Sequence, residues 1–129
     1  KKKSVNQIID MQRKKTGRLF NFCCYAVGSV ANQSAREKKK LASLGEDIGL
    51  LFQLADDFLD ITGSKKLTGK TIKKDKKKGK STLISLIGYK KTYSYANNLK
   101  NNILLKLKRY GKNADDLNNT VKFILGRNF

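Results

Sequence analysis

Three of the ten acidic residues in this 129-residue chain lie within five positions, as Asp56, Asp57 and Asp60. On a helix, Asp56 and Asp60 are one turn apart on one face, with Asp57 on its flank. Such a cluster repels itself unless a cation lies over it. Mg²⁺ suits the position because it binds one or two carboxylates, keeps several waters and completes its shell with phosphate oxygens. The spacing therefore predicts a magnesium site. A solvated face paired with nearby lysines is the alternative, but we expect the helix to end at Gly63, and a helix C-terminus disfavours negative charge.

A lysine-rich segment follows directly, with nine lysines and one acid between residues 63 and 80. Most of these lysines are expected in a solvated loop. Lys70 and Lys80 differ because each follows a glycine, which lets the backbone approach a ligand closely. A diphosphate held between magnesium and ammonium groups accounts for both the acidic cluster and the lysine-rich segment. A nucleotide-binding P-loop is excluded, because five residues rather than four separate Gly63 from Gly69 and a helix, not a strand, precedes them.

The composition narrows the possible classes of function. There are 29 Lys and Arg residues against 10 Asp and Glu, giving a net charge of +19, which favours polyanionic partners. Histidine is absent, which excludes Ser-His-Asp and Cys-His catalysis. The adjacent Cys23 and Cys24 cannot join distant segments, and we expect them to pack in the core of an intracellular, reduced protein. We find no stretch of about 20 apolar residues and no signal peptide, so a cytoplasmic location is expected.

The elements that position these residues are all expected to be helices, since proline is absent and apolar residues recur at steps of three and four. Residues 17–31 are apolar enough to predict a helix buried on several sides. Ser81 or Thr82 is expected to cap a helix that breaks near Gly88. The other expected helices cover residues 4–14, 36–61 and, from Asp115 or Asp116 onward, the C-terminal segment, with a turn at 111–113. The fold class is all-α.

These motifs, taken in order, resemble the C-terminal half of the trans-isoprenyl diphosphate synthases, the farnesyl and geranylgeranyl diphosphate synthase family. The matching segments are Lys15-Thr16-Gly17, residues 48–63 with Phe-Gln-x-x-Asp-Asp-x-x-Asp, Gly69-Lys70, Asp75 and residues 79–82. The resemblance covers residues 8–129 and weakens after Gly88. It implies the helical bundle of isoprenoid synthases, arranged around a central cavity, with residues 1–129 as its C-terminal half.

The resemblance also implies roles for individual residues. Asp56 would bind Mg²⁺ directly, with Asp57 and Asp60 as supporting or further ligands. Lys15, Lys70 and Lys80 would hold the diphosphate of an allylic substrate, and Thr16 and Gln53 would stabilise positive charge on its first carbons. The implied reaction ionises the allylic diphosphate, adds isopentenyl diphosphate and releases a proton, with farnesyl diphosphate as the expected product. The implied assembly is a homodimer of the full-length protein.

Three departures from the family pattern stand out. Lys73 replaces a common glycine before Asp75, and Leu83-Ile84 replaces a common Tyr-Pro. A first Asp-Asp-x-x-Asp motif is absent from the chain, and with it the isopentenyl diphosphate site. We therefore expect a fragment that is inactive alone, whose own residues do not determine product length.

Two other classes of function compete with this interpretation. A nucleic-acid-binding module would explain the charge, but the lysine-rich segment has no interleaved aromatic residues for base stacking. A non-catalytic partner subunit of a prenyl synthase is the second, although the complete Asp56–Asp60 motif argues against it. We also note Arg127, since the family often places near its C-terminus a basic residue that closes over the substrate.

Overall fold

The computed structural model describes residues 3–68 and 81–127, and within them it contains helices and no strand. The all-α prediction is therefore confirmed. The predicted sites at Lys70 and Lys80 and the loop aspartate Asp75 lie outside the described residues. In chain order the elements are α1 (Val5–Gln12), the π-helical segment η1 (Arg13–Gly17), α2 (Arg18–Val30), α3 (Ala35–Thr68), α4 (Leu83–Ile87), α5 (Tyr89–Leu107), a 3₁₀ segment (Lys108–Ala114) and α6 (Asp115–Gly126).

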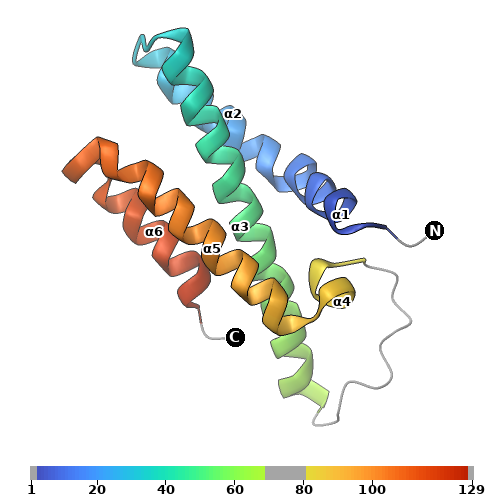
Figure 1. Ribbon diagram of the computed structural model, residues 1–129. Helices are drawn as coiled ribbons and strands as arrows, with labels where there is room; N and C mark the ends of the chain where they lie inside the picture. The colour runs from blue at the N-terminus through green and yellow to red at the C-terminus, as the bar shows by residue number, and fades with distance from the viewer. Residues whose placement is uncertain (1–2, 69–80, 128–129) are drawn as a thin grey trace.

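The long helix α3 organises the molecule (Figure 1). The continuous run α1–η1–α2 lies along one side of it, and the antiparallel pair α5 and α6 packs on another. Short α4 lies beside α1 and α5. At 1.5 Å per residue, the 34 residues of α3 extend about 51 Å, so one helix carries both the core contacts and the acidic motif.

The core is built on one face of α3, because its apolar residues recur at helical spacing and α5 and α6 cover them. Phe58 is fully buried and makes edge-on ring contacts with Tyr89 and Tyr93, at centroid distances of 4.9 and 5.8 Å. The other large, fully buried apolar residues are Ile8, Leu50, Leu51, Leu54, Leu83, Ile103, Leu107 and Val121. The packed face of α3 thus fixes the rotation of the helix and the direction of its acidic residues.

The predicted caps and turns are largely confirmed. Thr82 is the residue that caps α4, since its side chain accepts a hydrogen bond from the Ser85 amide. Gly88 adopts φ 87°, a conformation that favours glycine, and separates α4 from α5. Gly111, with φ 57°, provides the expected turn before α6.

The predicted end of α3 at Gly63 is wrong, because the helix continues to Thr68. A single exposed glycine costs a helix only about 1 kcal/mol relative to alanine, and the residues that follow it favour helix. Asp60 therefore lies eight residues before the end of the helix rather than in its last turn. The unfavourable helix-end charge that we used to favour a metal site does not apply.

The predicted burial around the two cysteines is also wrong in part. Cys23 is exposed and Cys24 is only partly buried. Helix α2, expected to be buried on several sides, has one buried residue, Gly28, and several exposed apolar side chains.

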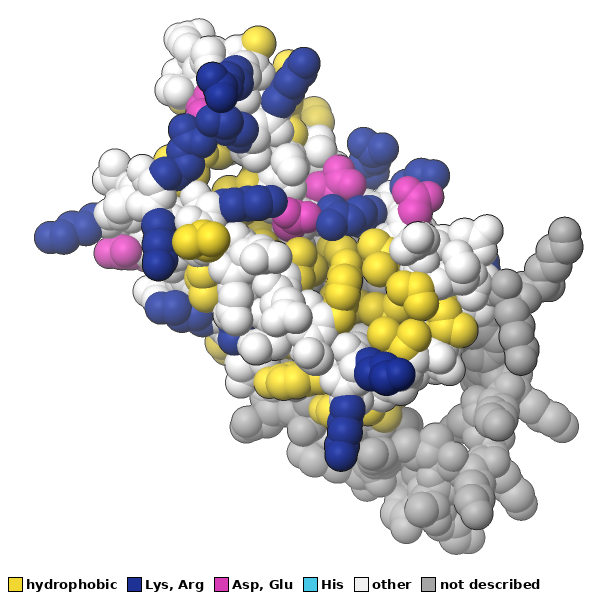
Figure 2. Space-filling model, viewed as in Figure 1, with side chains coloured by type: hydrophobic (Ala, Val, Ile, Leu, Met, Phe, Trp, Pro, Cys, Tyr) yellow, Lys and Arg dark blue, Asp and Glu magenta, His cyan; other side chains and the backbone are white. Residues whose placement is uncertain are grey.

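Among the described helices, none is both long and apolar enough to cross a membrane. Lys and Arg side chains are scattered over the face shown in Figure 2, where Asp and Glu side chains are few.

Candidate functional site

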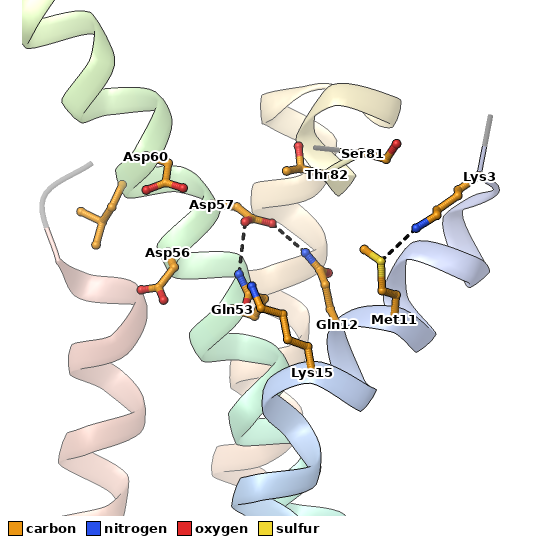
Figure 3. Close-up of a pocket in the computed structure, with 11 residues that line it drawn as sticks. Lys3, Met11, Gln12, Lys15, Gln53, Asp56, Asp57, Asp60, Ser81 and Thr82 are labelled. Atoms are coloured by element: carbon orange, nitrogen blue, oxygen red, sulfur yellow. Dashed lines mark hydrogen bonds between the residues drawn. The ribbon is translucent and has the colours of Figure 1, made fainter. Parts of the chain in front are cut away.

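A cavity of about 620 Å³ lies between α1, η1, α3 and the start of α4. Acidic, basic and amide side chains from these elements line it (Figure 3). The lining residues are Lys3, Met11, Gln12, Lys15, Gln53, Asp56, Asp57, Leu59, Asp60, Ser81 and Thr82. Of the eight site residues predicted from the sequence, six lie in the described part of the chain. Five of these six line the cavity, and Thr16 is the one that does not.

Two glycines of α3 bring the Lys15-Thr16-Gly17 motif against the acidic motif. A Cβ atom on Gly49 would lie 2.7 Å from the Cα of Gly17, and one on Gly45 would lie 2.3 Å from the carbonyl oxygen of Phe20. Only glycine permits such an approach, so the backbone of η1 and α2 lies directly on α3. This contact places Thr16 beside Gln53. Because Gln53 lies one turn before Asp57, it connects the Lys-Thr-Gly motif to the acidic motif.

The backbone at the Lys-Thr-Gly motif is π-helical and joins the two helices that we expected over residues 4–14 and 17–31. One extra residue per turn is rare in proteins and occurs frequently at functional sites. Asp47, 8% exposed, holds this segment in place: its carboxylate pairs with Arg13 at 2.9 Å and with Lys106 of α5 at 2.8 Å. The π-helical segment is therefore tied to both α3 and α5.

A chain of hydrogen bonds runs from Thr16 to Asp57. The Thr16 hydroxyl donates to Oε1 of Gln53 at 3.1 Å, and Nε2 of Gln53 donates to Oδ1 of Asp57 at 3.3 Å. Nε2 of Gln12 donates to the other carboxylate oxygen of Asp57 at 2.7 Å, as the dashed lines of Figure 3 show. Each oxygen of Asp57 thus accepts a hydrogen bond from an amide.

The three carboxylates have different surroundings. Burial raises the pKa of Asp57 above its ordinary value; Asp60 raises it further, while hydrogen bonds from Gln53 and Gln12 and the charge of Lys15 lower it. Asp56 lies more open, and its carboxylate is 3.6 Å from the Arg127 guanidinium, which also lies over the Phe52 ring at 5.4 Å. Arg127 therefore reaches the acidic motif from the end of α6, where the family resemblance implied a basic residue.

The geometry bears on how magnesium could be held. Within residues 3–68 and 81–127, no three His, Cys, Asp or Glu side chains converge closely enough to hold a metal ion. Asp57 faces two amides, whereas Asp56 and Asp60 lie one turn apart on the cavity wall. Two carboxylates, with waters and phosphate oxygens completing the shell, fit Mg²⁺. The donor set therefore suits a site in which Asp56 and Asp60 are ligands and Asp57 is a support.

Sequence reasoning missed Gln12, which is 4% exposed and forms the shorter hydrogen bond to Asp57. No local pattern marks Gln12, because its partner Asp57 lies 45 positions later in the chain. Ser81 and Thr82, expected as alternative caps and as part of the matching segment 79–82, also line the cavity.

Comparison with known proteins identifies the family. The family model of polyprenyl synthetase matches residues 1–122, so the chain belongs to the polyprenyl synthetase family. It is 30% identical over 125 residues to a farnesyl diphosphate synthase of Micrococcus luteus, covering 97% of this chain and 43% of the relative. It is 38% identical over 82 residues to a short chain isoprenyl diphosphate synthase of Methanocaldococcus jannaschii, covering 63% of this chain and 25% of that protein.

The fold agrees with a solved structure of the same family. The crystal structure of an FPP/GFPP synthase from Zymomonas mobilis superposes with a TM-score of 0.77 and 32% sequence identity, over 95% of this chain and 39% of that one. The resemblance inferred from the motifs is confirmed, as is the helical bundle that it implied. The chain spans less than half the length of these relatives.

Proposed function

We propose that this chain forms the allylic-diphosphate half of the active site of a short-chain trans-prenyl diphosphate synthase of the farnesyl type. The complete enzyme would condense an allylic diphosphate with isopentenyl diphosphate. The observation that supports this proposal is the convergence of Lys15, Gln53 and the Asp56–Asp60 motif on one cavity. Family membership gives the convergence its chemical meaning.

Lys15 and the acidic motif would bind the diphosphate from different elements. The ammonium group of Lys15 would hold phosphate oxygens directly, with Lys70 and Lys80 as further donors. Asp56 and Asp60 would hold Mg²⁺, which when bound neutralises charge on the departing diphosphate. Asp57 would keep its two amide partners and fix the rotation of the acidic turn.

Thr16 and Gln53 would face the carbon that becomes positive. When the allylic C–O bond breaks, its electron pair leaves with the diphosphate and the allyl group carries the charge. The double bond of isopentenyl diphosphate then forms the new C–C bond, and loss of a proton restores a neutral product. Because the Thr16 hydroxyl donates to Gln53, its oxygen lone pairs remain available to the cation. Such preorganised dipoles stabilise developing charge most effectively where water is excluded.

We further propose that the chain is inactive alone, because the second substrate's site and the first aspartate motif of the family have no counterpart in its sequence. The complete enzyme would be a cytoplasmic homodimer. A steady-state assay of the purified chain with an allylic diphosphate and isopentenyl diphosphate tests this directly. No turnover is expected, and turnover at an ordinary enzymatic rate would refute it.

Ligand binding tests the site separately. Titration calorimetry with inorganic pyrophosphate and MgCl₂ is expected to show binding that Asp56→Asn weakens by about tenfold or more, since a charge-assisted contact is lost. Asp10→Asn is the control, because Asp10 is exposed and pairs with Lys14 on the surface. Equal affinity for both variants would refute the role of Asp56. Duplex DNA titrated across salt concentrations checks the nucleic-acid alternative, which would give affinity that falls steeply with salt.

A further inference from the structure

A second cavity, of about 510 Å³, lies between the start of α3 and the end of α5, at the end of the molecule away from α4 (Figure 1). The residues that line it come from these two helices and the 3₁₀ segment: Arg36, Lys39, Lys40, Ser43, Leu44, Lys106, Arg109 and Tyr110. Lys40 and Asp56 are separated by about 24 Å along the axis of α3. The second cavity is therefore distinct from the one that contains the acidic motif.

Five of the eight residues that line the second cavity are Lys or Arg, and none of these eight described residues is acidic. The nearby acids are already paired. Glu37 accepts a hydrogen bond from the Tyr110 hydroxyl at 2.6 Å and pairs with Arg109 at 3.1 Å. Asp47, 8% exposed, pairs with Lys106 at 2.8 Å. The cavity thus holds more positive charge than these carboxylates neutralise.

Two of the five cations are not neutralised in this way. Arg36 and Lys39 are exposed and form no ion pair or hydrogen bond with another residue that the structure describes. They lie about one turn apart near the start of α3, both on the wall of the second cavity. Their charged groups are therefore available to a bound anion.

The base of the second cavity is apolar. Leu44 is 3% exposed, and the Tyr110 ring is half-buried. The orientation of this ring is fixed, because its hydroxyl donates to Glu37 and the Arg109 guanidinium lies over the ring at 5.3 Å. Lys and Arg side chains can add their methylene groups to the walls while their charged ends stay in water. An apolar base with a cationic rim is complementary to a ligand that has an apolar body and an anionic end.

We propose that the second cavity binds an organic phosphate. Its phosphate oxygens contact Arg36 and Lys39, and its apolar body lies against Tyr110 and Leu44. Phosphate suits this rim because guanidinium and ammonium groups bind its oxygens through charge-assisted hydrogen bonds. The volume of about 510 Å³ is within the range of small-molecule sites, about 300–1,000 Å³. The inference does not depend on the proposed function, since the two cavities share no lining residue.

Titration calorimetry with phenyl phosphate, at physiological salt and with EDTA present, tests the proposal. Binding is expected, and Lys39→Ala is expected to weaken it by about tenfold, because one charge-assisted contact is lost. Lys108→Ala is the matched control. Lys108 is exposed and adjacent to Arg109 but does not line the cavity, so its loss is expected to change affinity by less than about twofold. Inorganic phosphate, which has no apolar body to bury, is expected to bind at least about tenfold more weakly than phenyl phosphate.

A second variant and a second readout locate the bound molecule. Arg36→Ala is expected to weaken binding similarly, and circular dichroism shows that each variant retains its helices. In two-dimensional NMR spectra, phenyl phosphate is expected to shift the amide signals of Ser43 and Leu44 and to leave that of Gln53, in the acidic cavity, unchanged. Lys39→Ala is expected to change the binding of pyrophosphate with MgCl₂ by less than about twofold. Failure here is therefore distinguishable from failure of the proposed function.

Soluble phosphate esters and the headgroups of anionic lipids share this chemistry, and sedimentation with phosphatidylglycerol vesicles separates the two sources. Co-sedimentation that Lys39→Ala reduces and Lys108→Ala does not would assign the phosphate to a lipid headgroup. Any other sedimentation result would assign the site to a soluble organic phosphate.

Three results would overturn the inference. The first is absence of phenyl phosphate binding to the unaltered chain. The second is equal affinity of Lys39→Ala and Lys108→Ala, because the overall charge would then account for binding. The third is an NMR shift at Gln53 without one at Ser43 and Leu44, because the ligand would then occupy the acidic cavity.

Discussion

Gln12, the last residue of α1, donates a 2.7 Å hydrogen bond to Asp57, which lies 45 positions later in α3. Both side chains are buried, at 4% and 8% exposed. Gln53 donates to the other oxygen, so the carboxylate is held between amides of two different elements. A buried carboxylate without such donors is costly, and its partners therefore determine how it is oriented. The contact fixes the acidic turn of α3 relative to α1 while leaving Asp56 and Asp60 on the cavity wall.

Replacing Gln12 by methionine is expected to destabilise the fold by about 1–3 kcal/mol, because it keeps the volume but removes a donor from a buried carboxylate. Urea denaturation measures the change. Gln33→Met is the control: Gln33 is exposed, its side chain donates only to the Ala31 carbonyl in the turn before α3, and it is expected to change stability by less than about 0.5 kcal/mol. Equal midpoints for the two variants would show that the Gln12–Asp57 bond does not stabilise the fold.

The close contact of η1 with α3 yields a prediction about glycine. Gly49→Ala would place a methyl group 2.7 Å from the Gly17 Cα, and the backbones must separate to admit it. We expect a loss of about 1–3 kcal/mol and weaker pyrophosphate binding, since Thr16 and Lys15 move with the backbone. Gly63→Ala in the same helix meets nothing within 4 Å and is expected to stabilise by about 1 kcal/mol through helix propensity. Thermal unfolding of Gly49→Ala and Gly63→Ala measures the two effects. Similar shifts in Tm for both variants would show that the close contact at Gly49 does not limit stability.

Spacing along one helix was enough to predict much of the site from the sequence. Asp56 and Asp60 lie one turn apart on the cavity wall as the i, i+4 relation requires, and Gln53 lies one turn before Asp57. The helices themselves follow from apolar periodicity, which is strongest where α3 is buried on α5 and α6. Local rules sufficed for Thr82 and Gly88, because capping and positive φ depend on the residue and its neighbours alone.

Features that depend on contacts between distant segments were not accessible from the sequence. Gln12 has no special chemistry by itself and acquires a role only because Gly17 and Gly49 let η1 approach α3. The end of α3 was misjudged because glycine is a weak breaker, whose cost neighbouring residues offset. The burial of α2 was overestimated because an apolar sequence does not distinguish a covered helix face from an exposed one.

Tyr110 and Glu37 tie the 3₁₀ segment to the start of α3 through a 2.6 Å hydrogen bond. That hydrogen bond is the main cause of the lowered pKa of Glu37. Partial burial raises this pKa, whereas the charges of Arg109 and Lys40 lower it further. Because the pKa of Glu37 is lower in the folded state, its ionised carboxylate stabilises the fold at any pH above the unfolded-state pKa of about 4.3. This stabilisation is lost as the pH falls through the folded-state pKa.

The difference in free energy of unfolding between the unaltered chain and Tyr110→Phe is therefore expected to be largest near neutral pH and to decrease below about pH 4. Urea denaturation at a series of pH values measures it. Tyr25→Phe is the control, because Tyr25 is exposed on α2 and contacts Lys38 through its ring, which phenylalanine retains. A Tyr110→Phe difference that remains constant down to about pH 3 would show that the Glu37 hydrogen bond does not set this dependence.

Lys15 and Lys14 are adjacent in sequence but differ in what surrounds them. Lys15 lines the cavity and lowers the pKa of Asp57 through its charge, whereas Lys14 points outward and pairs with Asp10 at 2.8 Å. Lys15→Ala is expected to weaken binding of inorganic pyrophosphate with MgCl₂ by about tenfold, because one charge-assisted contact is lost. Lys14→Ala removes the same formal charge and is expected to change affinity by less than about twofold, since Lys14 does not line the cavity and its charge is largely screened at physiological salt. Calorimetry of the two variants thus separates a specific contact from the general attraction of a chain with a net charge of +19. Equal losses would assign pyrophosphate binding to the overall field rather than to the cavity.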